Sequence, residues 1–187
     1  EAYVVITLEK DYMAFDSNSQ SLQEISTKLN GKSVLNPSGD FQLLKYNLQT
    51  KNVDKTSQYH NSVVTITACY KYMTQVITEV CIDPHLYDLA PTIKACEVKD
   101  LSLGDQGAPV AVTEIEQTYL RDQVRFTVTI KQVGDGTVLN AYDNDAYDAC
   151  PFTLERDDID YVGVEMAING LGEPSCVPAS QYIRLND

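Results

Sequence analysis

Five cysteines are the residues of this sequence whose chemistry is easiest to assign. They are widely spaced, and no two of them form the C-x-x-C pair that is typical of zinc sites. Neither of the two histidines stands close enough in sequence to complete a zinc ligand set. We therefore expect disulfides, formed in an oxidising compartment. The disulfide candidates are Cys69, Cys81, Cys96, Cys150 and Cys176.

The number of cysteines is odd, so at least one of them has no partner within the chain. Five choices of the unpaired cysteine and three pairings of the other four give 15 schemes with two bridges. The sequence alone does not choose among these schemes. The alternative to disulfides is a set of buried free thiols in a cytosolic core.

An acidic loop is the candidate for a metal site that we consider first. Asp143, Asp145 and Asp148 lie within seven residues of one another, and calcium prefers oxygen ligands in a flexible loop. The glycine and the distal glutamate of the helix-loop-helix calcium site are missing, which makes these aspartates weak calcium candidates. A solvated acidic loop is the interpretation that we favour, and we expect neither a cofactor nor an essential metal.

Motifs for catalysis are incomplete throughout the sequence. Gly31, Lys32 and Ser33 resemble the end of a phosphate-binding loop, but the first glycine of that motif is absent. The G-x-S-x-G motif of serine hydrolases is also absent. His60 and His85 fall in predicted loops without a matching nucleophile. We therefore expect a protein that is not an enzyme.

Charge and hydropathy exclude two classes of partner. The 187 residues have a net charge of -13, which disfavours nucleic acid and anionic lipid because both require neutralised phosphates. Apolar runs such as 3–6 are far shorter than the roughly 18 residues that span a bilayer, so we expect no membrane segment. The sequence opens at Glu1 without Met, as we expect of a mature extracellular or cell-surface chain after loss of a signal peptide.

The first third of the sequence predicts two strands around one short helix. Residues 2–9 and 41–48 have the composition of strands, rich in Val, Ile, Tyr, Leu and Phe. Ser21 with Glu24 forms a capping box, and the apolar spacing that follows predicts a helix over 22–29. We expect no other convincing helix.

The middle of the sequence predicts a β-hairpin between 63–72 and 76–82. With residues 73–75 as its loop, Ile66 faces Ile82 and apolar partners share one face. Two prolines in 83–91 then indicate a linker between β units, which we place at 1–92 and 93–187. Closely spaced strands predict an all-β fold, an antiparallel immunoglobulin-like β-sandwich. The strands of the second unit are expected at 96–103, 110–119, 124–133, 161–168 and 182–185.

One segment resembles a known family. Residues 124–138 read VRFTVTIKQVGDGTV, in which Phe126, Val128 and Ile130 alternate toward one face before a Gly-x-Gly turn. This segment resembles the CARDB type of immunoglobulin-like domain that is common in archaeal surface proteins, and the segments 69–84 and 96–113 are similar to archaeal ectodomains. The resemblance implies a β-sandwich and a role in adhesion, envelope structure or filament formation.

Two functional hypotheses follow. The first is a structural subunit of an extracellular filament, pilus or surface layer, which self-associates by β-strand addition. The second is a monomeric adhesion module that binds a glycan or a protein through its loops. The N-terminal strand is the candidate for donation to a neighbour because it is short, β-branched and apolar on both faces. The assembly strand consists of Tyr3, Val4, Val5, Ile6, Thr7 and Leu8.

Overall fold

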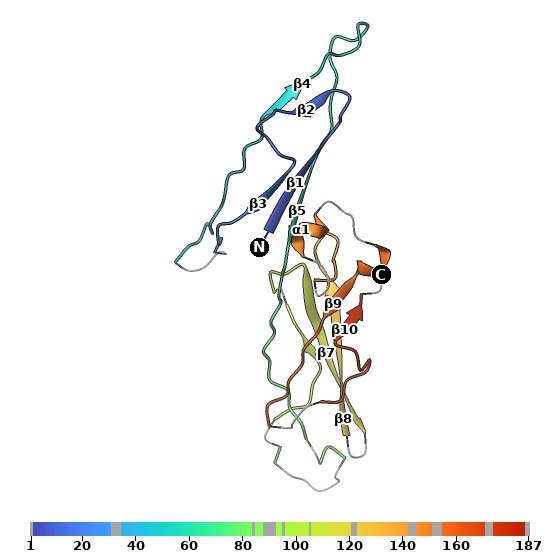
Figure 1. Cartoon of the computed structure of the whole chain (residues 1–187). Coiled ribbons are helices and arrows are strands. Elements are labelled where there is room, and N and C mark those ends of the chain that lie inside the picture. The colour runs from blue at the N-terminus through green and yellow to red at the C-terminus, as the bar shows by residue number, and fades with distance from the viewer. Residues whose placement is uncertain are drawn as a thin grey trace. The chain divides into compact units, whose positions relative to one another are not determined.

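The fold is known from a computed structural model, which describes most of the chain. The described residues are 2–30, 35–83, 85–87, 93–94, 96–104, 106–120, 123–141, 145–150, 155–170 and 174–185. They form mostly β structure with one short α-helix and several small antiparallel sheets (Figure 1). Among these residues we find no helix with the length and apolar character needed to cross a membrane.

The elements follow one another along the chain as short strands with two brief helical turns. In order they are β1 (Ala2–Leu8), β2 (Met13–Phe15), β3 (Leu22–Ile25), β4 (Leu48–Thr50), β5 (Val64–Tyr70), β6 (Leu101–Ser102), β7 (Val110–Leu120), β8 (Gln123–Gln132), α1 (Ala146–Ala149), the 3-10 turn η1 (Arg156–Asp158), β9 (Tyr161–Gly163) and β10 (Tyr182–Arg184).

The chain divides into two compact units that are not simple halves of the sequence. Unit 1 contains residues 1–71 and 141–157, and unit 2 contains residues 72–140 and 158–187. The chain therefore enters unit 2, returns to unit 1 to form α1, and enters unit 2 again. The expectation of two separately folding domains, 1–92 and 93–187, stays a prediction.

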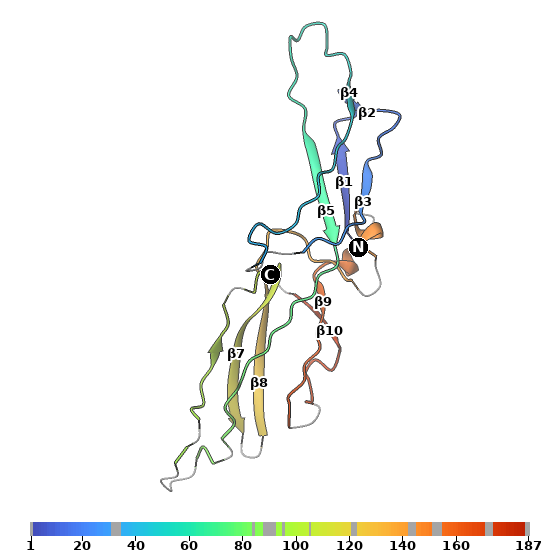
Figure 2. The ribbon, with the colours of Figure 1, turned by 90° about the vertical axis from the view of Figure 1, so that its left-hand side faces the viewer.

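Unit 1 is built around the central strand β1. β1 pairs antiparallel with β3 on one side and with β5 on the other, so that the sheet order is β3-β1-β5 (Figure 2). Val4, Ile6 and Leu8 are the buried residues of β1, and they alternate along the strand as one face of a pleated sheet requires. The predicted strand over 2–9 is thus confirmed.

The predicted helix over 22–29 is wrong. Its first turn is the strand β3, in which Ile25 lies opposite Ala2 and Leu22 opposite Val5. A capping box and helical spacing are local signals worth a few tenths of a kcal/mol to about 1 kcal/mol each. Pairing with the edge of β1 satisfies a row of backbone hydrogen bonds and outweighs them.

The predicted hairpin between 63–72 and 76–82 is also wrong. Its first strand exists as β5, but β5 pairs with β1 over seven positions, and Ile66 lies opposite Ile6 instead of Ile82. Residues 76–82 form no strand. The loop Met73-Thr74-Gln75 lacks the Gly, Asn or Asp that tight hairpin turns need, whereas β1 offers a complete apolar partner.

Unit 2 contains the longest strands of the chain. β7 and β8 form an antiparallel hairpin from Val110 opposite Gln132 to Leu120 opposite Gln123, interrupted by a bulge between Val112 and Glu114. β6 extends this sheet beside β7, and β9 with β10 forms a second, two-stranded sheet. These sheets confirm the strands expected at 110–119 and 124–133.

Other expected strands are shorter than predicted. Within 41–48 only Leu48 belongs to a strand, β4, and within 96–103 only β6 forms. β9 and β10 cover parts of 161–168 and 182–185. The alternation expected from the family resemblance is present in β8, where Phe126 and Val128 are half-buried and Arg125 and Thr127 are exposed.

A disulfide between Cys81 and Cys96 closes a loop in unit 2, which confirms the expectation of at least one intrachain bridge. The same loop is attached to β7, because the Tyr119 hydroxyl donates to the Cys81 carbonyl at 3.0 Å and accepts from the Asp83 N–H at 3.1 Å. Lys94 lies 3.0 Å from the Asp83 carboxylate. The ion pair therefore joins the two ends of the loop beside the disulfide.

Removing this disulfide tests how much the loop depends on it. The bridge joins residues 15 apart in sequence, and closing a loop of that length stabilises the folded state by about 3 kcal/mol. We expect Cys81→Ser with Cys96→Ser to lower the free energy of unfolding by about this amount in urea titrations. The exposed Cys176 supplies the control, because Cys176→Ser should leave stability unchanged. Equal stability of the double variant and the control would contradict this account.

Candidate functional site

The predicted assembly strand lies in the middle of the sheet of unit 1. Within the described residues β3 and β5 have no pairing with each other, and β1 is the strand that joins them. Each residue from Ala2 to Leu8 has a partner in β5, and Ala2 to Val5 have a second partner in β3. Donation of this strand to a neighbouring copy concerns an assembly and stays a prediction.

The edge strand β5 exposes an apolar face. We define the β5 apolar face as Val64, Ile66, Ala68 and Tyr70, which point to the same side of the sheet because they alternate along the strand. Ile66 is 66% exposed and Tyr70 is 55% exposed. Their side of the sheet is not exposed everywhere, since Ile6, the residue opposite Ile66, is only 7% exposed.

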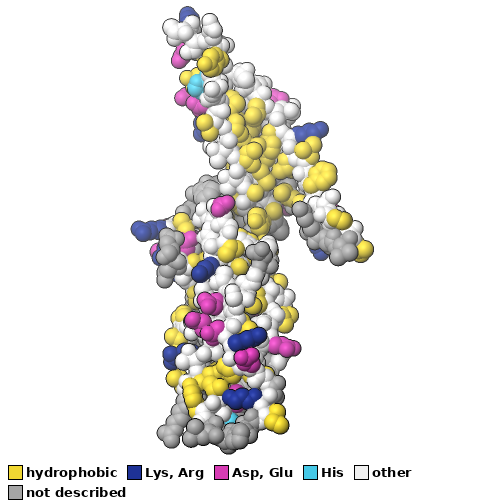
Figure 3. Space-filling model, turned by 180° about the vertical axis from the view of Figure 1, so that it is seen from behind, with side chains coloured by type: hydrophobic (Ala, Val, Ile, Leu, Met, Phe, Trp, Pro, Cys, Tyr) yellow, Lys and Arg dark blue, Asp and Glu magenta, His cyan; other side chains and the backbone are white. Residues whose placement is uncertain are grey.

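On this side of the sheet, the residues of β1 are therefore buried and those of β5 are exposed. The Tyr46 hydroxyl donates to the Val4 carbonyl of β1 at 3.5 Å. Burial and, to a smaller degree, the Cys150 thiol raise the pKa of Tyr46. Figure 3 shows hydrophobic side chains gathered over the strands of unit 1. Interaction surfaces of proteins often contain exposed apolar rows of this kind.

The turn that follows β1 is attached to the start of β5. The N–H groups of Tyr12 and Met13 donate to the Glu9 carbonyl, closing the turn between β1 and β2. The Glu9 carboxylate lies 3.1 Å from His60 Nε2 and accepts from the Val63 N–H at 3.4 Å. Tyr12 stacks on the His60 ring with centroids 3.5 Å apart. We call Glu9, Tyr12, His60 and Val63 the β1 clasp.

The hydrogen bond from His60 holds the pKa of Glu9 below its ordinary value, and the Val63 N–H acts in the same direction. A depressed carboxyl pKa stabilises the folded state above the pKa of the unfolded chain. That contribution disappears as pH falls through the folded pKa. We therefore expect the contribution of the Glu9 carboxylate to the β1 clasp to be lost in acid.

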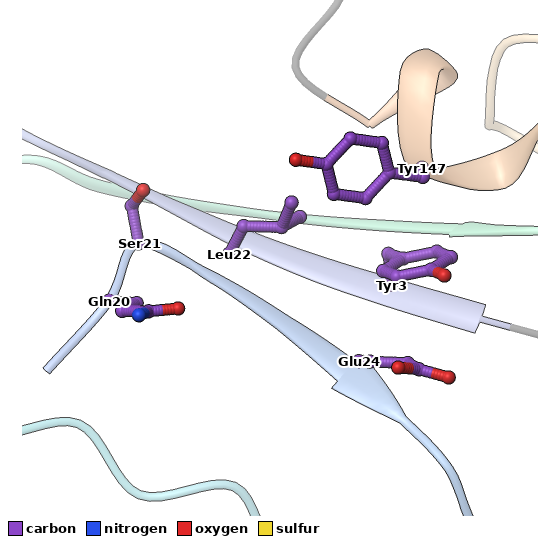
Figure 4. A pocket seen from close by; sticks show the side chains of 6 residues that line it. All are labelled: Tyr3, Gln20, Ser21, Leu22, Glu24 and Tyr147. Carbon is purple, nitrogen blue, oxygen red and sulfur yellow. The ribbon is translucent and has the colours of Figure 1, made fainter.

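A shallow pocket in unit 1 lies beside β1 and β3. It has a volume of about 570 Å³ and is lined by the residues shown in Figure 4, namely Tyr3, Gln20, Ser21, Leu22, Glu24 and Tyr147. The rings of Tyr3 and Tyr147 meet edge to face with centroids 5.5 Å apart. The pocket therefore offers aromatic faces next to amide, hydroxyl and carboxylate groups.

Of the three weak calcium candidates, the structure describes Asp145 and Asp148. Asp145 pairs with Lys71 at 2.9 Å, which occupies its carboxylate with a cation of the protein. Asp148 lies in α1 and Asp143 lies outside the described residues. Across the described ranges no three His, Cys, Asp or Glu side chains are grouped so that they could hold a metal ion.

Three cysteines remain as thiols beside the Cys81–Cys96 disulfide. Cys69 in β5 and Cys150 at the end of α1 are buried in unit 1, whereas Cys176 in unit 2 is exposed. Sequence reasoning identified all five cysteines but did not place Cys69 and Cys150 together. It also missed α1, because a helix of four residues is too short to show a helical repeat.

Comparison with known proteins gives no assignment. The chain matches no family model, no curated protein and no solved structure.

A pH titration tests the β1 clasp. We expect the Glu9 carboxyl to titrate below 4.5 in the folded protein, because the hydrogen bond from His60 favours its charged form. NMR detection of the side-chain carboxyl carbon measures this midpoint directly. His60→Ala should return the midpoint toward 4.5. A wild-type midpoint at or above that value would show that the clasp does not form.

Proposed function

We propose that this chain is a non-catalytic structural subunit of an extracellular filament, pilus or cell-surface layer, and that copies of it assemble by β-strand addition. The main support is the β5 apolar face, which is exposed beside the buried residues of β1. A single chain leaves this face in water, and burial of apolar surface is the dominant favourable term in association.

The exposed hydrophobic side chains agree with this proposal. Among the described residues, twenty large hydrophobic side chains are exposed and eight hydrophobic residues are buried. Contacts between copies would bury part of this excess.

The mode of assembly that we propose is exchange of β1. In one chain β1 fills the space between β3 and β5, and a neighbouring copy could supply an identical β1 with the same register. Such an exchange keeps every backbone hydrogen bond of the sheet, so it costs little enthalpy. Repeated head to tail, it gives an open polymer in which each copy is joined to the next.

We further propose that unit 2 has a CARDB-like immunoglobulin-like fold, in which the β6-β7-β8 and β9-β10 sheets are parts of a β-sandwich. The alternation along β8 supports this fold. The Cys81–Cys96 disulfide supports an extracellular or cell-surface location, because disulfides persist in oxidising compartments. The net charge of -13 is consistent with self-association without nucleic acid.

Removing β1 tests strand exchange. Deletion of residues 1–9 should leave a destabilised chain that no longer polymerises, because β3 and β5 then lose the strand that joins them. A synthetic peptide with the sequence of residues 1–9 should restore its stability when added in trans, as thermal unfolding and light scattering would show. The matched control is the same peptide with Val4→Asp and Ile6→Asp. Polymerisation of the deleted chain like that of the wild type would contradict the proposal.

A single substitution on the β5 apolar face tests the contact surface. Ile66→Lys places a charge where a neighbour would pack, at a side chain that is 66% exposed in one chain. We expect it to abolish polymer formation in electron micrographs while the monomer unfolds at nearly the same temperature. Thr65→Lys is the control, because Thr65 is exposed on the opposite face of the same strand. The surface assignment fails if both variants polymerise equally.

The second candidate function is a monomeric adhesion module that binds a glycan or protein, and the pocket between Tyr3 and Tyr147 favours it. Aromatic faces beside polar groups are a common arrangement for binding sugars and peptides. If this candidate is right, Tyr147→Ala should lose binding to a glycan array that the wild-type chain recognises. Thr65→Lys again serves as a control outside the pocket. Absence of wild-type binding would remove this candidate.

A further inference from the structure

Cys69 and Cys150 come from distant parts of the chain and meet in unit 1. Cys69 lies in β5 opposite Tyr3 of β1. The Cys150 thiol at the end of α1 donates toward the Tyr3 carbonyl, with the sulfur 3.4 Å from the oxygen, and lies 3.8 Å from the Thr67 carbonyl oxygen. Tyr3 lies opposite Cys69 in the sheet, and Thr67 is the residue before Cys69 on the same face of β5.

The two thiols are in contact and are shielded from water. Cys150 is 0% exposed and Cys69 is 8% exposed. Burial, together with a hydrogen bond between the two thiols, raises the pKa of Cys69 to about 12. The helix that holds Cys150 is itself packed on the sheet, with Ala146 and Ala149 buried. Both ends of a possible bridge are therefore held in place by the fold.

We propose that Cys69 and Cys150 form a second disulfide, which joins α1 to β5 next to β1. Among the 15 schemes with two bridges that the sequence allows, this scheme pairs the two cysteines of unit 1 and leaves Cys176 as the odd thiol. The Cys81–Cys96 bridge in unit 2 supports an environment in which such a bond persists. The proposal is independent of how copies of the chain assemble.

The reaction is oxidation of two thiols by a disulfide-containing small molecule. One cysteine thiolate attacks the oxidant and releases a small thiol, and the second cysteine thiolate displaces the other half of the oxidant. Two S–H bonds are lost, one S–S bond is formed, and the oxidant receives the two electrons and two protons as it becomes two thiols. Buried thiols with little thiolate react slowly, so the bond forms during folding, before α1 packs on the sheet.

Peptide mapping tests the proposal directly. Trypsin cleaves after Lys and Arg and places each cysteine in its own peptide, namely 56–71, 72–94, 95–99, 132–156 and 157–184. The chain is refolded with oxidised glutathione, unfolded without reductant, alkylated and digested. We expect peptide 56–71 to be linked to 132–156, peptide 72–94 to be linked to 95–99, and peptide 157–184 to be alkylated. Alkylated 56–71 and 132–156, or a link from either one to 157–184, would overturn the proposal.

A thermal measurement in a background without the first disulfide gives a second test. In Cys81→Ser with Cys96→Ser, adding a reductant should lower the melting temperature by about 10 °C, because a stabilising cross-link in a small unit is lost. Adding Cys150→Ser to this background should remove the effect of the reductant, whereas adding Cys176→Ser should keep it. A melting temperature that does not change with reductant in the starting background would contradict the bridge.

Discussion

The pairing of β1 with both β3 and β5 is the interaction on which the structure of unit 1 depends. β3 contributes four paired positions and β5 contributes seven, and these strands are joined through β1. The buried residues Val4, Ile6 and Leu8 also lie on this strand, so its hydrogen bonds and its apolar contacts form together. Displacement of β1 would therefore separate β3 from β5. The proposed strand exchange requires that a β1 strand from another copy takes the same place between them.

The features around β1 have different strengths and different chemistry. At one end of the strand the β1 clasp holds the turn after Glu9 through groups near the surface, so its contribution is modest and depends on pH. Near the other end, α1 and the buried thiols of Cys69 and Cys150 pack beside Tyr3. The weaker clasp holds the turn after β1, which is the turn that opens if β1 moves to a neighbouring copy.

The edge strand β5 exposes an apolar face within a single chain. A sheet with two polar faces would expose threonine and charged residues on its edge strand, as natural edge strands commonly do. β5 has Thr65 and Thr67 on one face but Val64, Ile66, Ala68 and Tyr70 on the other. The free energy of burying the second face, about 25 cal/mol for each Å² of apolar surface, is available for association.

The sequence predicted strands well where a long run of β-branched residues decided the outcome. β1, β7 and β8 are such runs, and each was expected within about two residues of its ends. Leu22 to Ile25 was expected as helix because its local signals compete with a partner strand that is distant in sequence. The same limit explains the wrong partner for Ile66, since register between distant strands depends on contacts that no local pattern specifies.

The candidate site was predictable only in part for the same reason. The cysteines and the apolar character of Tyr3 to Leu8 are visible in the sequence, and they led to the expected disulfide and the expected assembly strand. The approach of Cys150 to Cys69 and of Tyr147 to Tyr3 arises because the chain returns to unit 1 after unit 2. That return has no signal in composition or periodicity.

An engineered cross-link within the sheet tests the central claim most directly. Leu8 lies opposite Val64, on the face of the sheet away from Cys69. In a Cys176→Ser background, Leu8→Cys with Val64→Cys is assembled, oxidised and run on a denaturing gel without reductant. Strand exchange predicts a ladder of covalently linked chains, while Val110→Cys with Gln132→Cys, opposite each other in β7 and β8, stays a single-chain band. A single-chain band from the Leu8 and Val64 pair in polymerised material would contradict the account.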